Sequence, residues 1–274
     1  MTLLDGKKVS NEIIDNIQKE IDKIEKKIGF AIIWIGNDSA SSIYVKNKIK
    51  KCENVGIYTE LHHLEETISE ESVFDLIDNL NEREDIQGIL LQSPIPKHID
   101  INKCFNKINP SKDIDGFSNI SCGNLFLGNP TFVSCTPKGI MRLLEYYNID
   151  LEGKNVCLIN RSNIVGKPLF HLLIEKNATV TMCHSKTTNL KNITKNSDIV
   201  ISAVGKANFI TEDMIKEDAI VIDVGICRVD GKVMGDVDFE NVSKKCSFIT
   251  PVPGGVGPMT IAMVLENILE SVKE

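Results

Sequence analysis

The stretch that decides the fold is Val156-Cys157-Leu158-Ile159-Asn160-Arg161-Ser162-Asn163-Ile164-Val165-Gly166-Lys167-Pro168. Its first four residues form a short apolar run, typical of a buried strand, and the polar turn after them leads to Gly166 and Pro168, which are typical of a helix start. Apolar runs with helical spacers between them follow at residues 179–183, 199–203 and 220–224. This alternation predicts a doubly wound, Rossmann-like parallel sheet of the kind that binds nucleotides.

The beginning of the chain carries apolar residues at helical spacing. They are Val9, Ile13, Ile17, Ile21, Ile24 and Ile28. The stripe predicts an amphipathic helix that ends at Gly29. Because an apolar run follows at once at residues 30–35, we expect this helix to pack against a sheet, the alternative being a short coiled coil.

The first half of the chain continues as a smaller α/β alternation. Residues 40–54 and 72–81 have helical spacing, residues 57–64 an extended pattern, and the apolar run 87–92 predicts a further strand. A loop rich in Gly, Asn and Pro, residues 115–137, separates this part from the second series. We therefore expect two α/β domains, one of residues 1–137 plus 258–274 and one of residues 138–257, with the last helix, 260–272, packed back on the first domain.

Composition excludes several classes of protein. With 274 residues the chain is long enough for about two domains, each with its own core. Its apolar runs, such as residues 31–35, are too short to cross a membrane. A net charge of −7 with scattered lysines argues against nucleic acid, so we expect a small-molecule ligand. Asp5 falls where a signal peptide needs its apolar core, which predicts a cytoplasmic protein.

The eight cysteines and five histidines show no spacing typical of a metal site, so we expect free thiols and no metal. Cys183, next to His184, could be read as a nucleophile. Neighbours on a strand point to opposite faces, however, and a buried thiol is the favoured interpretation.

The turn after the strand 156–159 lacks the usual glycine triplet, and only Gly166 stands where a helix must approach closely. An NAD site usually has an acid after the next strand, but His184-Ser185-Lys186 follows instead. Arg161 and Ser185 could bind a 2′-phosphate, which favours NADP over NAD. The alternative is that these are solvated loop residues.

Tyr44 and Lys48 are four residues apart on a predicted helix and therefore share a face. A lysine partly desolvated by an aromatic ring can act as an acid or base near neutral pH. Gln92 ends a predicted strand and Asp115 precedes a turn glycine, so both belong where strand ends and loops gather. We expect the four side chains to line one pocket. The alternatives are a surface lysine over a half-buried tyrosine and an ordinary turn aspartate.

The segment 250–260 has three prolines and three glycines ahead of the last helix. Glycines let a backbone approach a ligand closely and prolines fix its path, so we expect a rigid ligand-facing loop. An interdomain hinge is the alternative.

Together these segments resemble the methylenetetrahydrofolate dehydrogenase/cyclohydrolase family over almost the whole chain. The motifs that carry the resemblance are Tyr44-x-x-x-Lys48, Gln92-x-Pro94-x-Pro96, Asp113-x-Asp115-Gly116, Arg161-Ser162-x-Ile164-Val165-Gly166-x-Pro168 and Pro251-Val252-Pro253-Gly254-Gly255-Val256-Gly257-Pro258-Met259-Thr260. Their order and spacing both agree with the family.

The resemblance implies NADP-linked oxidation of 5,10-methylenetetrahydrofolate to the methenyl form, then hydrolysis to 10-formyltetrahydrofolate. It implies that Lys48 is the central catalytic group, that Gln92 holds it, that Tyr44 stacks on the substrate and that Asp115 binds the pterin. It also implies a homodimer. The implied cofactor contacts are Asn160, Arg161, Ser162, Gly166, Ser185 and Ile226, and the implied further substrate contacts are Pro253, Gly254, Gly255, Val256 and Gly257.

Asn160 departs from the family, which usually has glycine there. Its side chain is expected to take space near the pyrophosphate, although asparagine tolerates the backbone angles of such a turn. Two other functions stay open: a dehydrogenase that has lost hydration and a non-catalytic nucleotide-sensing module. A third alternative is an amino-acid or shikimate-type dehydrogenase, and the arrangement of Tyr44, Lys48, Gln92 and Asp115 argues against it.

Overall fold

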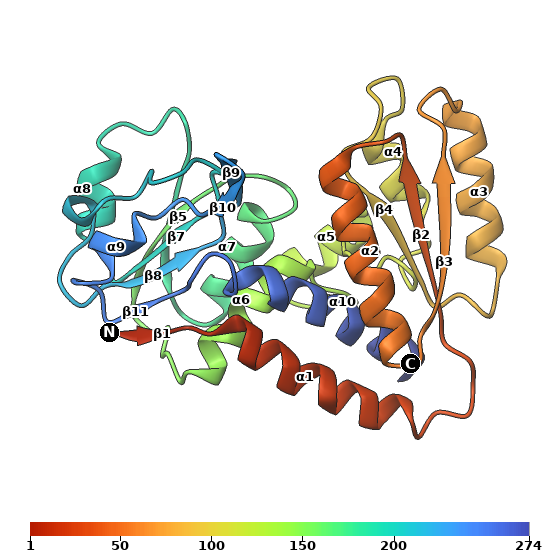
Figure 1. Ribbon diagram of the computed structural model, residues 1–274, viewed down its shortest axis with the longest axis horizontal. Helices are drawn as coiled ribbons and strands as arrows, with labels where there is room; N and C mark the ends of the chain where they lie inside the picture. Colours follow the sequence, from red (N-terminus) through yellow and green to blue (C-terminus); the bar gives the residue numbers. More distant parts are fainter. Residues whose placement is uncertain (274) are drawn as a thin grey trace. The chain divides into compact units, whose positions relative to one another are not determined.

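The computed structural model describes residues 1–273, apart from the side chains of residues 39 and 40 (Figure 1). The chain forms two compact units. The large-sheet unit contains Met1–Asn11 and Cys135–Met263, and the small-sheet unit contains Glu12–Ser134 and the chain from Val264 on. This division differs from the expected boundaries, because the first residues pair with the large sheet.

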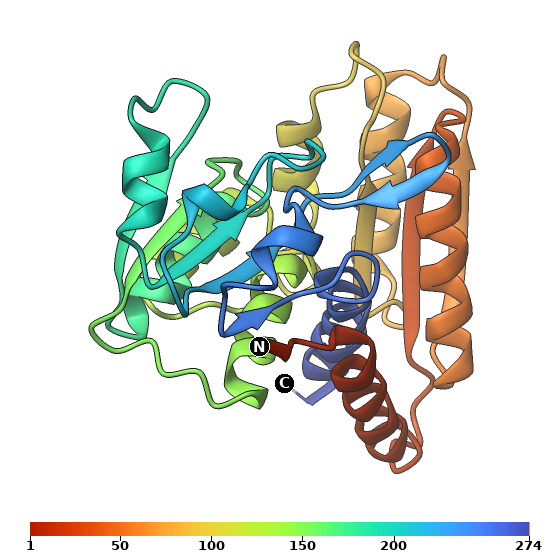
Figure 2. The ribbon, with the colours of Figure 1, turned by 60° about the vertical axis from the view of Figure 1, so that its left-hand side comes forward.

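The large-sheet unit is built on a six-stranded parallel sheet in the order β1-β11-β8-β7-β5-β6. The four strands predicted from apolar runs are present and lie side by side. The two further strands are only two residues long, too short for a sequence pattern, and Figure 2 shows them next to each other. In this order the bounds are β1 Thr2–Leu3, β11 Phe248–Ile249, β8 Ile220–Asp223, β7 Ile199–Ser202, β5 Asn155–Ile159 and β6 Thr179–Cys183.

Strand order reverses at β5, which has β6 on one side and β7 on the other. In open α/β sheets the carboxyl ends of strands at such a point form the ligand-binding crevice. Strand residues pack into an apolar core that includes Cys183, which is fully buried as predicted. The other elements of this unit are α6 Cys135–Tyr146, α7 Gly166–Glu175, α8 Leu190–Lys195, η1 Glu212–Met214, β9 Cys227–Val229, β10 Lys232–Met234 and α9 Phe239–Val242.

The small-sheet unit contains a three-stranded parallel sheet in the order β3-β2-β4, as the alternation predicted. The strands are β2 Gly29–Ile35, β3 Tyr58–Leu64 and β4 Gly88–Gln92, and the helices are α2 Ser39–Asn54, α3 Glu70–Glu82, α4 Ile101–Lys107 and α5 Asn119–Phe126. Residue Asp113 extends the sheet by a parallel bridge to Ile89, beyond β4. Helix α5 lies inside the segment expected to be a loop. That expectation was wrong because Ser118 caps a short helix in spite of the surrounding turn residues.

Two helices run from one unit into the other. Helix α1, Gly6–Ile21, ends before Gly29, and the expected extension to Ile28 is wrong. The amide of Ile24 bonds back three residues to Ile21, and Ile28 is buried at the start of the sheet. Helix α10, Val256–Lys273, begins four residues earlier than predicted, and its second half belongs to the small-sheet unit. No helix within residues 1–273 is long and apolar enough to cross a membrane.

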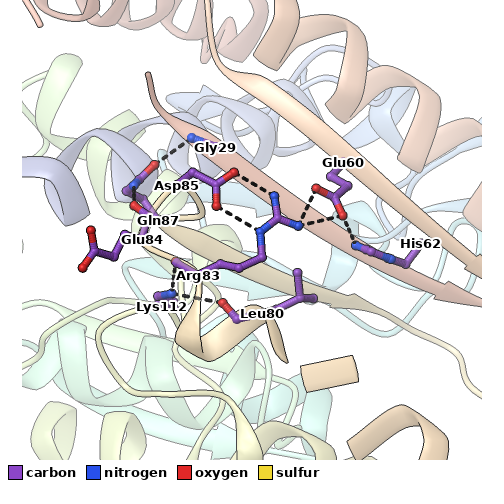
Figure 3. A network of polar contacts seen from close by, with 9 residues as sticks. All are labelled: Gly29, Glu60, His62, Leu80, Arg83, Glu84, Asp85, Gln87 and Lys112. Atoms are coloured by element: carbon purple, nitrogen blue, oxygen red, sulfur yellow. Dashed lines mark hydrogen bonds and ion pairs between the residues drawn. The ribbon is translucent and has the colours of Figure 1, made fainter. Parts of the chain in front are cut away.

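A polar network fixes the amino-terminal edge of the small sheet (Figure 3). The Arg83 guanidinium binds the Asp85 carboxylate through two nitrogens, at 2.9 and 2.7 Å, and also binds Glu60 at 2.8 Å. The Lys112 ammonium donates to three backbone carbonyls at the end of α3. The side chain of Gln87 joins the strand starts by accepting from the amide of Gly29 at 2.7 Å. These contacts stabilise the edge opposite the strand ends that carry Gln92.

Candidate functional site

Lys48 and Gln92 meet at the carboxyl edge of the small sheet. The Lys48 ammonium donates to Gln92 Oε1 at 3.1 Å, and both side chains are partly buried. The Gln92 amide nitrogen donates in turn to the Ser93 carbonyl at 2.7 Å. Because the amide nitrogen is held this way, the oxygen faces the amine. The sequence predicted both residues at one edge of the sheet, and in the structure their side chains are in contact.

The beginning of α2 is anchored next to β4. The Asp38 carboxylate accepts from the amide of Ser41 at 2.7 Å and so caps the helix. The Ser41 hydroxyl donates to the Ser93 carbonyl at 3.3 Å, the same carbonyl that receives Gln92. Tyr44, one turn before Lys48 on the same helix face, is 42% exposed. The ring is thus open to a ligand beside the Lys48–Gln92 pair.

Sequence reasoning missed an aromatic pair in this region. Trp34 on β2 is in register with both Gln92 and His63, so these three side chains share one face of the sheet. The rings of Trp34 and His63 stack with centroids 4.0 Å apart and planes 5° from parallel. His63 Nε2 lies 2.8 Å from the Gly36 carbonyl and can donate to it. Only strand register could have revealed this row, because the three residues are far apart in the chain.

Cys52 lies one turn after Lys48 on α2 and is buried. Burial raises the pKa of its thiol to about 12. The thiol is therefore protonated at neutral pH and is excluded as a nucleophile beside the lysine.

Asp115 lies on a loop that buried groups hold in place. The Asp113 carboxylate, 1% exposed, accepts from the amides of Phe117 and Ser118 at 3.1 and 2.8 Å and from the Ser121 hydroxyl at 2.7 Å. Burial raises the pKa of Asp113. The parallel bridge between Asp113 and Ile89 places the start of this loop beside β4. The Gly116 amide then donates to the Asp113 carbonyl at 2.9 Å, so partly buried Asp115 lies in the turn that follows the bridge.

Asn267 on α10 holds the same loop from the other side, and sequence reasoning missed it. Its side-chain amide is fully buried and donates to the Ile114 carbonyl at 2.6 Å and to the Val133 carbonyl at 2.9 Å. An asparagine in a mostly apolar helix was the available signal.

The turn after β5 is closed by the side chain of Asn160. Its Oδ1 accepts from the amides of Ser162 and Gly166 at 2.8 and 3.0 Å. Its Nδ2 donates to the Ala203 carbonyl, after β7, at 2.6 Å. The turn thereby joins the two strands at which the sheet order reverses. A Cβ on Gly166 would lie 2.7 Å from Asn160 Oδ1, so only glycine fits there.

Arg161 and Ser185 follow matched strand ends. Ile159 of β5 is in register with Cys183 of β6, and each polar residue comes two positions later. Both side chains are exposed. The next acid in the chain, Asp198, lies at the opposite edge of the sheet, where it accepts from the Asn155 amide and pairs with Lys216. The donors at this corner therefore suit a phosphate rather than a ribose diol.

Two buried carboxylates hold the loops after β7 and β8, including exposed Ile226. Asp223 accepts from the amides of Gly225, Asp236 and Val237, and burial raises its pKa to about 6. Asp236 accepts from the amides of Val204 and Lys206 and the hydroxyl of Ser202. Neither of these carboxylates is exposed to a ligand.

The glycine-rich segment is packed against the start of α1. The Gly254 carbonyl accepts from the amide of Lys7 at 2.9 Å, and a Cβ on Gly6 would collide with the Gly255 carbonyl. Val256 and Gly257 belong to the first turn of α10 rather than to a loop. Pro253 is exposed. A Cβ on Gly255 would lie 2.6 Å from the Pro251 carbonyl oxygen, so this glycine serves close packing within the chain. Ligand contact by residues 253–257 stays a prediction.

Comparison with known proteins agrees with this geometry. Residues 4–115 match the family model of the tetrahydrofolate dehydrogenase/cyclohydrolase catalytic domain, and residues 134–274 match that of the family's NAD(P)-binding domain. The bifunctional protein FolD of Nautilia profundicola is 52% identical over 100% of this chain and 98% of its own length.

Solved structures show the same likeness. The FolD dehydrogenase/cyclohydrolase of Campylobacter jejuni is 47% identical with a TM-score of 0.98 and covers 100% of this chain and 99% of its own. The Trypanosoma brucei dehydrogenase-cyclohydrolase, solved with NADP and an inhibitor, is 34% identical with a TM-score of 0.96 over 100% and 97% of the two chains. On sequence and on structure, this chain belongs to the tetrahydrofolate dehydrogenase/cyclohydrolase family.

Proposed function

We propose that this chain oxidises 5,10-methylenetetrahydrofolate with NADP and then hydrolyses the methenyl product to 10-formyltetrahydrofolate. The contact between Lys48 and Gln92 carries the proposal, because it joins an amine to a fixed amide at a sheet edge beside an open tyrosine ring. The full-length similarity to bifunctional FolD proteins supports both steps.

The small-sheet unit is the folate-binding catalytic part in this proposal. Tyr44 stacks on the flat portion of the substrate, where an exposed ring gains contact area without losing much conformational freedom. Asp115 accepts hydrogen bonds from the N–H and amino groups of the pterin. The buried carboxylate of Asp113 and the amide of Asn267 hold the Asp115 loop for that contact.

The large-sheet unit binds NADP in this proposal. Arg161 and Ser185, at matched ends of β5 and β6, fit the 2′-phosphate, and Asn160, Ser162, Gly166 and Ile226 shape the crevice beside them. The bound cofactor supplies the hydride acceptor for the first step. NAD fits less well, because no acid follows β6 to hold a ribose diol.

Hydration of the methenyl carbon requires loss of a proton from water and protonation of the ring nitrogen that is released. Lys48 can do both in turn if its amine is neutral when water attacks. Gln92 keeps the amine aimed at one point, which lowers the cost of orientation.

The test is turnover of methylenetetrahydrofolate by the full chain, run in parallel with NADP and NAD, together with hydration of methenyltetrahydrofolate alone. We expect oxidation with NADP well above NAD, and hydration above the uncatalysed rate. Oxidation without hydration would show that the chain is a dehydrogenase only. Binding of nucleotide without either reaction would favour a non-catalytic nucleotide-sensing module.

The proposed enzyme is a homodimer. β3 is an edge strand of the small sheet and exposes Tyr58 and Leu61 at 41% and 40%. Proteins commonly cover an exposed strand edge of this kind. Pairing of two copies about a twofold axis covers the β3 edge of each copy with that of the other. Light scattering on the purified chain should give twice the monomer mass, and Leu61→Lys should lower it.

We place the enzyme in the cytoplasm. All eight cysteines are free thiols, and six of them are buried, which suits a reducing compartment. Fractionation of cells that express a tagged copy would test the location.

A further inference from the structure

The amino-terminal end of α7 has its amides bonded within the protein. The Gly166 amide donates to Asn160 Oδ1 at 3.0 Å, and the Val165 amide donates to the Ser162 hydroxyl at 3.1 Å. The Lys167 amide donates to the Ser162 carbonyl at 3.0 Å. Position 168 is proline, which has no amide hydrogen. From 165 through 168, the helix therefore presents no unbonded amide to a ligand.

This differs from the usual arrangement in nucleotide-binding sheets. There the first helix after the reversal point directs its unpaired amides at a phosphate, and the positive end of the helix dipole adds to the attraction. In this chain the Asn160 side-chain oxygen receives two amides of the turn, from Ser162 and from Gly166. Its position is fixed by donation from Nδ2 to the Ala203 carbonyl at 2.6 Å.

With the amides of residues 162 and 165–167 already bonded, exposed side chains are the donors that this corner offers to an anion. Arg161 and Ser185 are exposed beyond matched strand ends, and both can make charge-assisted hydrogen bonds to a phosphate group. Of the two nucleotides, only NADP carries a phosphate on the adenosine ribose. A site of this kind gains its affinity at the 2′-phosphate and little at the pyrophosphate.

We propose that the Asn160 amide oxygen occupies the place that a nucleotide phosphate takes at such a turn, so that Arg161 and Ser185 carry most of the anion recognition. The inference rests on the proposed function, since it assumes that a nicotinamide dinucleotide is the ligand. Asn160 thus lowers the affinity for NAD and for NADP alike, and Arg161 gives the preference for NADP over NAD.

The two roles predict different patterns in binding measurements. Removal of the Asn160 oxygen frees the amides of Ser162 and Gly166 for the pyrophosphate, which NAD and NADP share. Asn160→Gly and Asn160→Ala should therefore tighten both dissociation constants by about tenfold and leave their ratio unchanged. Arg161→Ala should weaken NADP alone, by at least about tenfold, and so bring the ratio towards one. The exposed Arg142→Ala is the control and should change neither constant.

Isothermal titration of the full-length chain with NADP and with NAD, without folate, measures these constants. Asn160→Asp keeps the side-chain shape and an acceptor for the two amides, loses the donation to the Ala203 carbonyl and adds a negative charge, so it should weaken both nucleotides. Melting curves of every variant show whether it is folded. The proposal is overturned if folded Gly or Ala variants bind both nucleotides no tighter than the parent, or if the Asp variant binds them as the parent does.

Failure of this inference can be told apart from failure of the proposed function. A parent chain that binds NADP and turns over methylenetetrahydrofolate, with unchanged constants in the Asn160 variants, would refute only the role of Asn160. A parent chain that binds neither nucleotide would refute the function itself.

Discussion

The Lys48 ammonium lies 3.1 Å from Gln92 Oε1, so a helix side chain and the last residue of a strand form one unit. The same Ser93 carbonyl receives the Gln92 amide nitrogen and the Ser41 hydroxyl of the helix start. Helix α2 and strand β4 are therefore joined by two contacts, one at Gln92 and one at the next residue, Ser93. The amine is held by the fold before any ligand arrives, which is the condition for efficient proton transfer.

Lys48→Met should abolish hydration of methenyltetrahydrofolate, with a loss of at least about 100-fold in rate, since methionine fills similar space but carries no proton. Decay of the methenyl absorbance, corrected for the uncatalysed rate, is the measurement. NADP binding should be unchanged. Lys46→Met, on the exposed side of the same helix, is the matched control and should hydrate at the parent rate. A Lys48 variant that hydrates as fast as its parent would remove this lysine from the mechanism.

Asp113→Ala should destabilise the chain by about 3 kcal/mol, because two amides and a hydroxyl lose their buried acceptor. The Asp115 loop should loosen as well, raising KM for the folate substrate. Urea unfolding and substrate titration measure the two effects. Asp75→Ala, exposed on α3, serves as the control and should stay within about 0.5 kcal/mol of the parent. Equal stability of the two variants would show that the Asp113 carboxylate does not hold the loop.

Asp223 predicts a specific pH dependence. Burial raises its pKa from 3.8 to about 6, so the folded state binds the proton more tightly than the unfolded chain does. This contribution to stability is present at low pH and disappears as pH rises through about 6. Relative to Asp223→Asn, which cannot titrate, the parent should lose about 2 kcal/mol between about pH 4.5 and 7.5. Urea unfolding at several pH values gives both curves, and a constant difference between them would contradict the prediction.

The sequence predicted most of the fold, because long apolar runs and helical spacing are local signals. All four main strands of the large sheet and all three strands of the small sheet were identified. Two of the misses share one cause, which is that contacts outside the local pattern decide them. Strand β11 has two residues and exists only because neighbours lie on both of its sides. Helix α1 ends at Ile21 although the apolar stripe continues to Ile28, which the sheet buries instead.

The candidate site was predicted less completely than the fold. Residue types and spacing placed Lys48 and Gln92 at one sheet edge, where they make contact. The stacking of Trp34 on His63 depends on strand register, which single residues do not encode. Asn160 was expected to intrude on a phosphate. Only coordinates show that its oxygen is already bonded to two backbone amides.

The packing of α1 on the glycine-rich segment gives a last prediction. A Cβ on Gly6 would collide with the carbonyl oxygen of Gly255, and both the helix start and that carbonyl are backbone groups that cannot rotate away. Gly6→Ala should therefore cost about 1–3 kcal/mol of stability and displace the segment that includes Pro253. Gly123 lies inside helix α5 with nothing within 4 Å of its added Cβ.

Gly123→Ala is accordingly the matched control, and it should stabilise the chain by about 0.5–1 kcal/mol because alanine restricts the unfolded chain and favours helix. Urea unfolding of the two variants beside the parent measures both changes, which are expected to have opposite signs. If Gly6→Ala also stabilises the chain, the two backbones are not in the close contact described, and the shape of the segment must have another cause than its packing on α1.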